Sequence, residues 1–409
     1  SKGHEFDSHI LHQQQRQVIA TAVTCFSNKA TTMNNQVSKI FAERFGGECR
    51  RYASAGRVNL IGEHTDYNGG FVFPGAIDRR IVAAIAPNGR QEVRVYAVDM
   101  QEESTFGLRE EDAPRQQWAR YVFGVCREVL KRGFRVEGFD AVMMGDVPLG
   151  AGLSSSAALE STFAFALNDM FNQGAIDPFE LARIGQSTEH NYCGVKCGIM
   201  DQFASIFGRK DCLMRLDCRS MEYEYFPFKP EGYRLLLVNS QVKHALVDSP
   251  YNRRRESCER VAALLGIDTL RDATFEALEA HRHQMSDEDY RRARYVVGEK
   301  QRVLDVCEAL EKGDYDTVGA RMYQTHWGMS RDYEVSCEEL DFLVALAERC
   351  GVAGSRIMGG GFGGCTINLV KESLLQGFQA TVAREFPARY GVEPIFIPVV
   401  ISDGAHRID

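Results

Sequence analysis

Four ionisable side chains lie close together in a glycine-rich segment near residue 60. The segment GRVNLIGEHTDYNGG spans residues 56–70 and carries Arg57, Glu63, His64 and Asp66 among glycines and apolar residues. Carboxylates and an imidazole supply the acceptors and donors that bind hydroxyl groups. His64 alone would be interpreted as a satisfied core histidine. The cluster of four ionisable groups favours a site for a polar ligand instead.

A second glycine-rich segment has the composition of an anion site. In PLGAGLSSSAALE, residues 148–160, Gly150 and Gly152 precede a predicted helix that begins with Ser154, Ser155 and Ser156. Glycines permit close backbone approach, and the N–H groups and dipole of a helix start favour negative charge. No Lys-Ser/Thr pair follows, so this is not the Walker pattern. An ordinary capped helix start is the alternative.

Other candidate residues are scattered along the chain, and each admits an ordinary structural role. Asp201 follows the mostly apolar stretch CGIM. A carboxylate in such surroundings requires an ion-pair or hydrogen-bond partner or a functional role, although helix capping would also explain it. Spacing alone favours a solvated Glu189 on a helix surface. Trp118 fits core packing, and Tyr251 fits a surface position at the head of a basic helix.

The segments that must position these residues are both strands and helices. The motif Asp177-Pro178-Phe179-Glu180 combines a cap residue, a proline at the first helical position and an acidic third residue, which is a strong helix start. A third glycine-rich segment, MGGGFGGC at 358–365, precedes a late strand. We expect strands at residues 52–61, 81–86, 92–98, 139–144, 234–239, 365–370 and 394–401. We expect helices ending before residue 46 and at residues 117–132, 154 onward, 178–193, 252–265, 290–312 and 315–329.

Composition narrows the class of protein. A chain of 409 residues that is 44% hydrophobic and 25% charged is typical of a two-domain globular protein. Its net charge of −8 argues against a general nucleic-acid or anionic-membrane surface. The 12 cysteines contain no CxxC pair, which favours reduced thiols in a cytoplasmic enzyme over a zinc site. The apolar run at 18–26 is too short to span a bilayer.

With the three glycine-rich segments in this order, the chain resembles the galactokinases, within the GHMP small-molecule kinase superfamily. Related sequence extends from about residue 37 to the C-terminus. The resemblance implies an α+β, two-domain GHMP kinase fold with the active site in the interdomain cleft. We expect an N-terminal extension over residues 1–32, poorly ordered and dispensable. An N-terminal domain over 33–228 would carry the sugar-binding and phosphate-binding motifs. A C-terminal domain over 229–409 would carry the third glycine-rich motif.

The resemblance also implies roles for individual residues. Asp201 would face the sugar hydroxyl that accepts the phosphoryl group, and Arg57 would orient Asp201 and offset developing charge. The implied galactose pocket consists of Glu63, His64, Asp66, Gly198, Asp201 and Tyr251. The implied ATP site consists of Gly150, Ala151, Gly152, Leu153, Ser154, Ser155, Ser156 and, beside the base, Trp118. Ser156 and Glu189 would bind Mg²⁺.

The implied activity is ATP-dependent phosphorylation of α-D-galactose at its anomeric hydroxyl, a step of galactose catabolism in the Leloir pathway. One alternative is an N-acetylgalactosamine kinase, but the motif His64-Thr65-Asp66-Tyr67-Asn68-Gly69 favours plain galactose. A second alternative is a non-catalytic galactose sensor, which the uninterrupted serine-rich loop disfavours. We expect a cytoplasmic monomer with galactose and ATP as its small-molecule substrates and with neither nucleic acid nor membrane as a partner.

Overall fold

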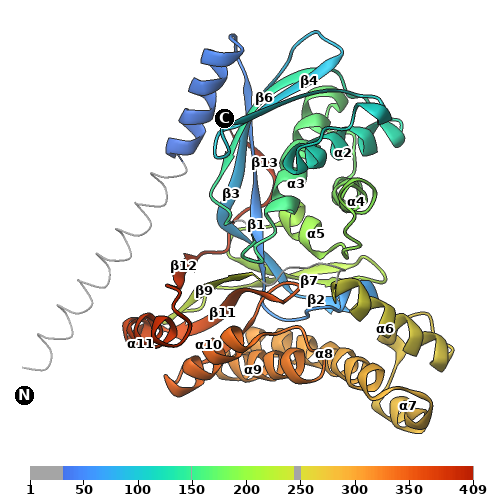
Figure 1. Ribbon diagram of the computed structural model, residues 1–409, viewed down its shortest axis with the longest axis vertical. Helices are drawn as coiled ribbons and strands as arrows, with labels where there is room; N and C mark the ends of the chain where they lie inside the picture. The colour runs from blue at the N-terminus through green and yellow to red at the C-terminus, as the bar shows by residue number, and fades with distance from the viewer. Residues whose placement is uncertain (1–30, 149, 244–249, 409) are drawn as a thin grey trace, which may run out of the picture.

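The computed structural model describes residues 31–148, 150–243 and 250–408 (Figure 1). A helix over residues 31–44 comes first. The strands are β1 (Arg50–Asn59), β2 (Phe71–Val72), β3 (Pro74–Pro87), β4 (Glu92–Ala97), β5 (Glu102–Gly107), β6 (Phe139–Gly145), β7 (Cys212–Asp217), β8 (Tyr223–Pro227), β9 (Tyr233–Lys243), β10 (Gly354–Ile357), β11 (Gly363–Lys371), β12 (Ile395–Val399) and β13 (His406–Ile408). The remaining helices are α2 (Gln117–Lys131), α3 (Ser155–Asn172), α4 (Pro178–Thr188), α5 (Met200–Phe207), α6 (Pro250–Leu265), α7 (Phe275–Ala280), α8 (Asp287–Glu311), α9 (Tyr315–Arg331), α10 (Glu338–Arg349) and α11 (Glu372–Tyr390).

A six-stranded sheet in the order β13-β1-β3-β6-β4-β5 organises the first half of the chain. Its neighbours are antiparallel except for β4 and β6, which run parallel with α2 between them in the sequence. Helices α2 to α5 cover one face, and the helix over residues 31–44 covers the other (Figure 1). Apolar residues alternate inward along β4, which is the pattern of a strand with one buried face.

A four-stranded antiparallel sheet in the order β10-β11-β9-β12 organises the second half. Helices α8, α9 and α10 lie below it, and a small sheet of β2, β7 and β8 lies between this region and the first sheet (Figure 1). The last strand, β13, returns to pair with β1, so the chain ends in the first sheet and not in the second.

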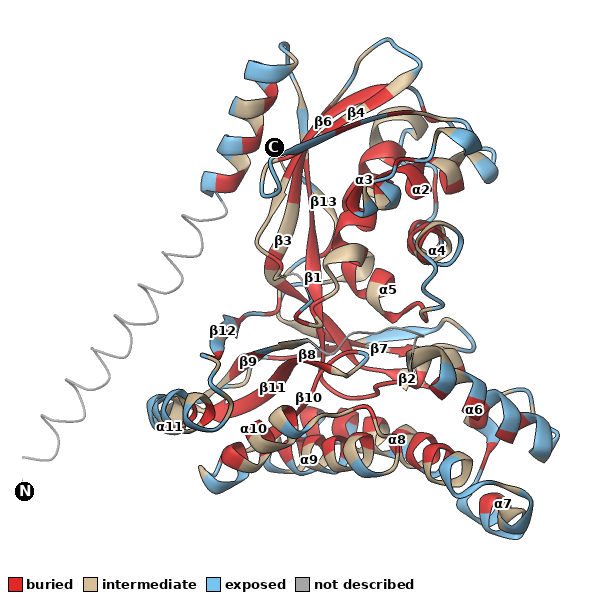
Figure 2. Cartoon of the chain, viewed as in Figure 1, coloured by how far each residue is buried: buried red, intermediate tan, exposed pale blue. Residues whose placement is uncertain are grey.

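One apolar cluster joins the two sheets. It packs Val58 and Phe73 from the first half against Leu237, Val303 and Ile367 from the second. Figure 2 shows that the strands of both sheets are largely buried where they approach each other. Because interiors of this kind are close-packed, the end of β1 is held firmly against the third glycine-rich segment.

Several sequence expectations are confirmed at the level of elements. Asp177 caps α4, with its Oδ1 accepting from the N–H of Phe179 at 2.8 Å. The strand expected at 394–401 is β12, although β13 follows it. Residues 1–30, most of the expected N-terminal extension, lie outside the described residues. The division of the chain near residue 228 stays a prediction. Among the described helices, none is long and apolar enough to cross a membrane.

Candidate functional site

Asp201 contacts the first two glycine-rich segments, through Arg57 and Ser154. It lies in the first turn of α5, and its carboxylate accepts two hydrogen bonds from Arg57, Nε to Oδ1 at 2.8 Å and Nη2 to Oδ2 at 3.0 Å. The hydroxyl of Ser154 also donates to Oδ2. This paired arrangement fixes both the position and the plane of the carboxylate.

Arg57 is itself buried and held by the serine-rich loop. Its side chain is 4% exposed, and Nη1 donates to the carbonyl oxygen of Gly152. Burial alone would lower the pKa of this guanidinium, but the charges of Asp201 and Glu63 raise the pKa overall. Arg57 therefore stays cationic beside the start of α3.

The serine-rich loop forms a tight turn before α3. Gly150 and Gly152 have φ of 69° and 74°, and Ser154 has φ of 56° at the helix N-cap. The turn packs against β1, since the N–H of Arg57 donates to the carbonyl of Leu153 at 3.1 Å. A Cβ on Gly152 would lie 3.0 Å from the carbonyl oxygen of Met358. The second and third segments therefore touch through backbone, and the Met358 side chain lies in the apolar core.

The first segment brings Asp66 against Gly198. An added Cβ on Gly198 would lie 1.7 Å from Oδ2 of Asp66, so any larger residue there must displace the Asp66 side chain. The Asp66 carboxylate accepts the N–H of Tyr67 through Oδ1 at 2.9 Å. Burial, and then the nearby charge of Asp201, raises the pKa of Asp66 to about 6.

His64 lies in a cluster of aromatic rings. Its Nδ1 is 2.7 Å from the hydroxyl of Tyr67, which is 2.7 Å from that of Tyr333. The ring centroid of Tyr251 is 5.2 Å from that of His64. Burial lowers the pKa of His64 to about 3, so the imidazole is neutral. Its Nε2 is buried without a hydrogen-bond partner among the described residues, which leaves one polar atom available for a ligand.

Glu63 is held from two sides. Its Oε1 accepts from Nη2 of Arg356 at 3.0 Å and from the N–H of Gly359 at 2.9 Å. The hydroxyl of Tyr295 on α8 donates to the carbonyl of Glu63 at 3.1 Å, and Glu299 accepts the N–H of Gly62 at 2.8 Å.

These supporting residues were missed by sequence reasoning. Arg356, Tyr295 and Glu299 lie more than 230 positions from the segment they hold, as the separations of 293, 232 and 237 show. In the amino-acid sequence alone, no pattern distinguishes these three residues from other residues of basic or helical segments.

Glu189 is buried, contrary to the solvated position that its spacing alone favoured. It begins a π-helical turn over Glu189–Cys193 that continues α4, a rare feature that often marks functional sites. Burial raises the pKa of Glu189 to about 7, although a hydrogen bond with Ser156 acts in the opposite direction. A buried carboxylate beside a hydroxyl is a donor set that suits a hard cation.

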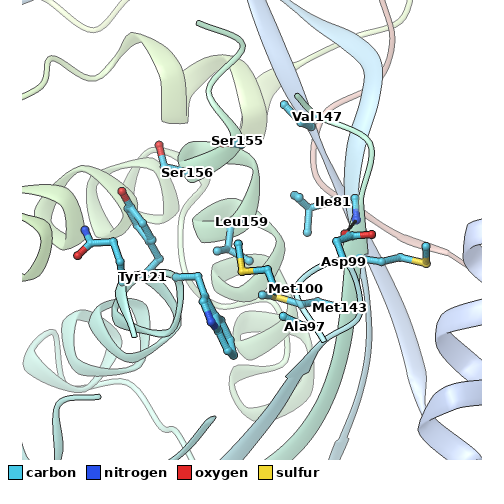
Figure 3. A pocket seen from close by; sticks show the side chains of 14 residues that line it. Ile81, Ala97, Asp99, Met100, Tyr121, Met143, Val147, Ser155, Ser156 and Leu159 are labelled. Carbon is cyan, nitrogen blue, oxygen red and sulfur yellow. Dashed lines mark hydrogen bonds between the residues drawn. The ribbon is translucent and has the colours of Figure 1, made fainter. Parts of the chain in front are cut away.

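A cavity of about 430 Å³ opens beside Ser156. It is lined mainly by apolar side chains of β4, β6 and α2, with Ser155 and Ser156 at one end and Trp118 in its wall (Figure 3). Trp118 Nε1 donates to Glu102 at 2.7 Å, which fixes the indole. The size and apolar lining fit a small-molecule ligand that enters with its polar end toward the serines.

Comparisons with known proteins identify the family. The galactokinase galactose-binding signature matches residues 39–87, and the GHMP kinase N-terminal and C-terminal domains match residues 120–209 and 307–388. A galactokinase of Thermotoga maritima is 40% identical over 354 residues, covering 86% of this chain and 98% of the relative. One from Roseiflexus is 40% identical over 359 residues, covering 86% and 91%.

This chain belongs to the galactokinase family. The crystal structure of Lactococcus lactis galactokinase complexed with galactose is 33% identical, has a TM-score of 0.87 and covers 91% of this chain and 98% of its own. A mevalonate kinase from Methanococcus jannaschii, at 16% identity and a TM-score of 0.63, shares the fold. The expected α+β GHMP kinase fold is confirmed, and the chain is an ATP-dependent kinase by family.

Proposed function

We propose that this galactokinase-family enzyme transfers the γ-phosphoryl group of ATP to the anomeric hydroxyl of α-D-galactose, giving galactose 1-phosphate and ADP. The observation that carries the proposal is the Asp201 carboxylate, held by Arg57 and Ser154 where the galactose-binding signature meets the serine-rich loop. One group that faces both motifs is what a transfer between a sugar and a nucleotide requires.

In this mechanism Asp201 accepts the proton of the anomeric hydroxyl. The oxygen of that hydroxyl forms a bond to the γ-phosphorus of ATP, while the bond between the γ-phosphorus and the β–γ bridging oxygen breaks and ADP leaves. Arg57 offsets the charge that develops on the transferred group. Asp66, His64, Glu63 and Tyr251 orient the sugar through its other hydroxyls and its ring face. His64 contributes as a neutral imidazole because burial lowers its pKa.

The nucleotide would lie with its base in the cavity beside Trp118 and its phosphates against the N–H groups at the start of α3. Ser156 and Glu189 would hold Mg²⁺, which supplies charge neutralisation on the phosphate oxygens when bound. The buried carboxylate of Glu189 supports this assignment, because a nearby cation would favour its ionised form.

Changing Glu189 to Gln should raise the Mg²⁺ requirement while leaving galactose binding nearly intact. Equal loss of galactose binding would count against the assignment.

A sugar panel tests the proposed substrate. ADP release would be measured with galactose, N-acetylgalactosamine, glucose, arabinose and mevalonate, and the product would be identified by phosphorus NMR. We expect galactose to be the fastest acceptor. Faster turnover with N-acetylgalactosamine would reassign the substrate, and galactose binding without ADP release would support the sensor alternative. Cytoplasmic location and a monomeric state stay predictions.

A further inference from the structure

A second cavity, of about 490 Å³, lies between helices α8 and α9 and shares no lining residue with the proposed nucleotide cavity. Figure 1 shows the two helices side by side below the second sheet, with α7 beyond the end of α8. We call it the α8–α9 pocket. Its lining includes three arginines, Arg294, Arg302 and Arg331, and a single acidic residue, Asp332. The pocket is therefore cationic.

Two of the three arginines lack an acidic partner within the part of the chain that the structure describes. Among the described residues, neither Arg294 nor Arg331 makes an ion pair, and Arg331 instead lies over the ring of Trp327 at 4.5 Å. The indole of Trp327 is fixed by a 3.0 Å hydrogen bond from Nε1 to Glu348. The lining holds three further aromatic rings, those of Phe275, Tyr295 and Tyr323. Guanidinium groups beside aromatic faces are the combination that binds a phosphate carried on a ring.

Two glycines make room for this pocket. Gly298 on α8 and Gly328 on α9 are both in its lining. A Cβ at Gly298 would lie 2.8 Å from Nη1 of Arg302, and one at Gly328 would lie 2.8 Å from the ring of Tyr295. Glycine inside a helix costs about 1 kcal/mol relative to alanine. These positions thus give up helix stability for the space in which Arg302 and Tyr295 lie.

The pocket also contacts the residues that hold the galactose-binding segment. Arg302 Nε donates to Glu299 at 2.6 Å, and the other Glu299 oxygen accepts the N–H of Gly62. Tyr295, in the pocket wall, donates to the carbonyl of Glu63. An anion that pairs with Arg302 would compete with Glu299, and so would loosen the carboxylate that holds Gly62.

We propose that the α8–α9 pocket is an effector site for a small phosphate monoester carrying a sugar or base ring, and that its occupation weakens galactose binding. The occupation of the pocket is independent of the proposed catalytic function. Its coupling to galactose rests on that function, because it assumes that the segment of Gly62 and Glu63 binds the sugar. By linkage, galactose must weaken the binding of the effector by the same factor.

The two tryptophans of the chain make the pocket testable. The sequence contains only two, Trp118 in the nucleotide cavity and Trp327 in the α8–α9 pocket. In a Trp118→Phe variant of the full chain, Trp327 alone reports by fluorescence. Adenosine 5′-monophosphate and glucose 6-phosphate would be titrated separately. A saturable change with both means that the phosphate and any ring suffice, and a change with one alone identifies a nucleotide or a sugar phosphate as the ligand class.

Arginine variants decide where the probe binds. Adding Arg294→Ala and Arg331→Ala to the Trp118→Phe chain should weaken the fluorescence response at least about tenfold, as expected when charge-assisted hydrogen bonds to phosphate are lost. The control is Arg384→Ala, which removes an exposed guanidinium on α11, and it should leave the response unchanged. The proposed site would be overturned if neither probe gave a response, or if the response survived in the double-arginine variant.

Calorimetric titration of galactose tests the coupling. With the effective probe present, galactose affinity of the parent chain should fall about fivefold or more, and the Arg294→Ala, Arg331→Ala variant should show no such fall. If the fall persists in that variant, the probe competes in the sugar pocket and the coupling is wrong. If galactose fails to bind even without the probe, the proposed catalytic function fails while the fluorescence result still stands.

Discussion

At the residue scale, the contact between Gly198 and Asp66 strictly limits the size of the side chain at position 198. A Cβ at position 198 would overlap Oδ2 of Asp66, so Gly198→Ala must displace a carboxylate that the proposed galactose site uses. We expect galactose affinity to fall at least tenfold while ATP binding persists, measured by calorimetry with each ligand. The control is Gly377→Ala, on the open surface of α11 with no atom within 4 Å of the added Cβ. Unchanged galactose affinity in Gly198→Ala would remove Asp66 from the site.

The pKa of Asp66 predicts a pH-dependent change in stability. Burial raises this pKa from 3.8 to about 6, so the folded state retains a proton that the unfolded chain has already released. Protonation of Asp66 therefore stabilises the folded state. This contribution to the free energy of unfolding is fully present below pH 3.8 and is lost as pH rises through about 6. Asp66→Asn keeps the acceptor for the N–H of Tyr67 but cannot ionise.

Asp66→Asn should therefore be more stable than the parent at pH 7.5, by about 1–3 kcal/mol, and equally stable near pH 4. Urea unfolding at the two pH values measures the difference, and galactose binding should be lost in the same variant. If the variant were less stable than its parent at pH 7.5, the ionised Asp66 carboxylate would not destabilise the folded protein, and the prediction would be wrong.

At the element scale, Arg356 ties β10 to the end of β1. Its side chain is fully buried and donates to the carbonyls of Leu60 and Ile357 at 2.9 and 2.7 Å, besides its ion pair with Glu63. Removing one partner of a buried pair leaves the other charge uncompensated. Arg356→Met should lower the free energy of unfolding by about 3–5 kcal/mol.

A double-mutant cycle separates this pair from general packing. Adding Glu63→Gln to Arg356→Met should recover part of the lost stability, because no buried charge is then left alone. Strictly additive losses in urea unfolding would mean that the ion pair does not link the two strands.

Sequence patterns predict local features of this fold well. The cap at Asp177, the serine-rich helix start and the strand of β9 are each encoded in a few neighbouring residues. The burial of Glu189 was not predictable from its spacing, because it depends on the π-helical turn and on α2 packing against that turn. Arg356 and Glu299 were missed for a related reason, since their partners lie hundreds of positions away and periodicity carries only local information.

At the scale of the whole molecule, the first sheet depends on the helix over residues 31–44. Val37 and Phe41 of that helix are buried against Ala53 and Val142. Deleting residues 1–30 should therefore leave activity and melting temperature near those of the parent. A deletion through residue 44 should destabilise strongly, because removing each large buried side chain costs about 2–5 kcal/mol. Thermal melts compare the two deletions, and a large loss from the shorter one would contradict its dispensability.

Asp201 contacts both the galactose-binding signature, through Arg57, and the serine-rich loop, through Ser154, and its catalytic role is the central claim. The most direct measurement is the turnover of galactose by Asp201→Asn, with galactose and ATP binding measured in the same preparation. Asparagine keeps the size and one acceptor but cannot take up the proton. We predict that turnover falls about 10²–10⁴-fold, the usual contribution of a general base, while ATP still binds and the protein still unfolds cooperatively. Near-normal turnover with galactose would contradict the catalytic assignment of Asp201.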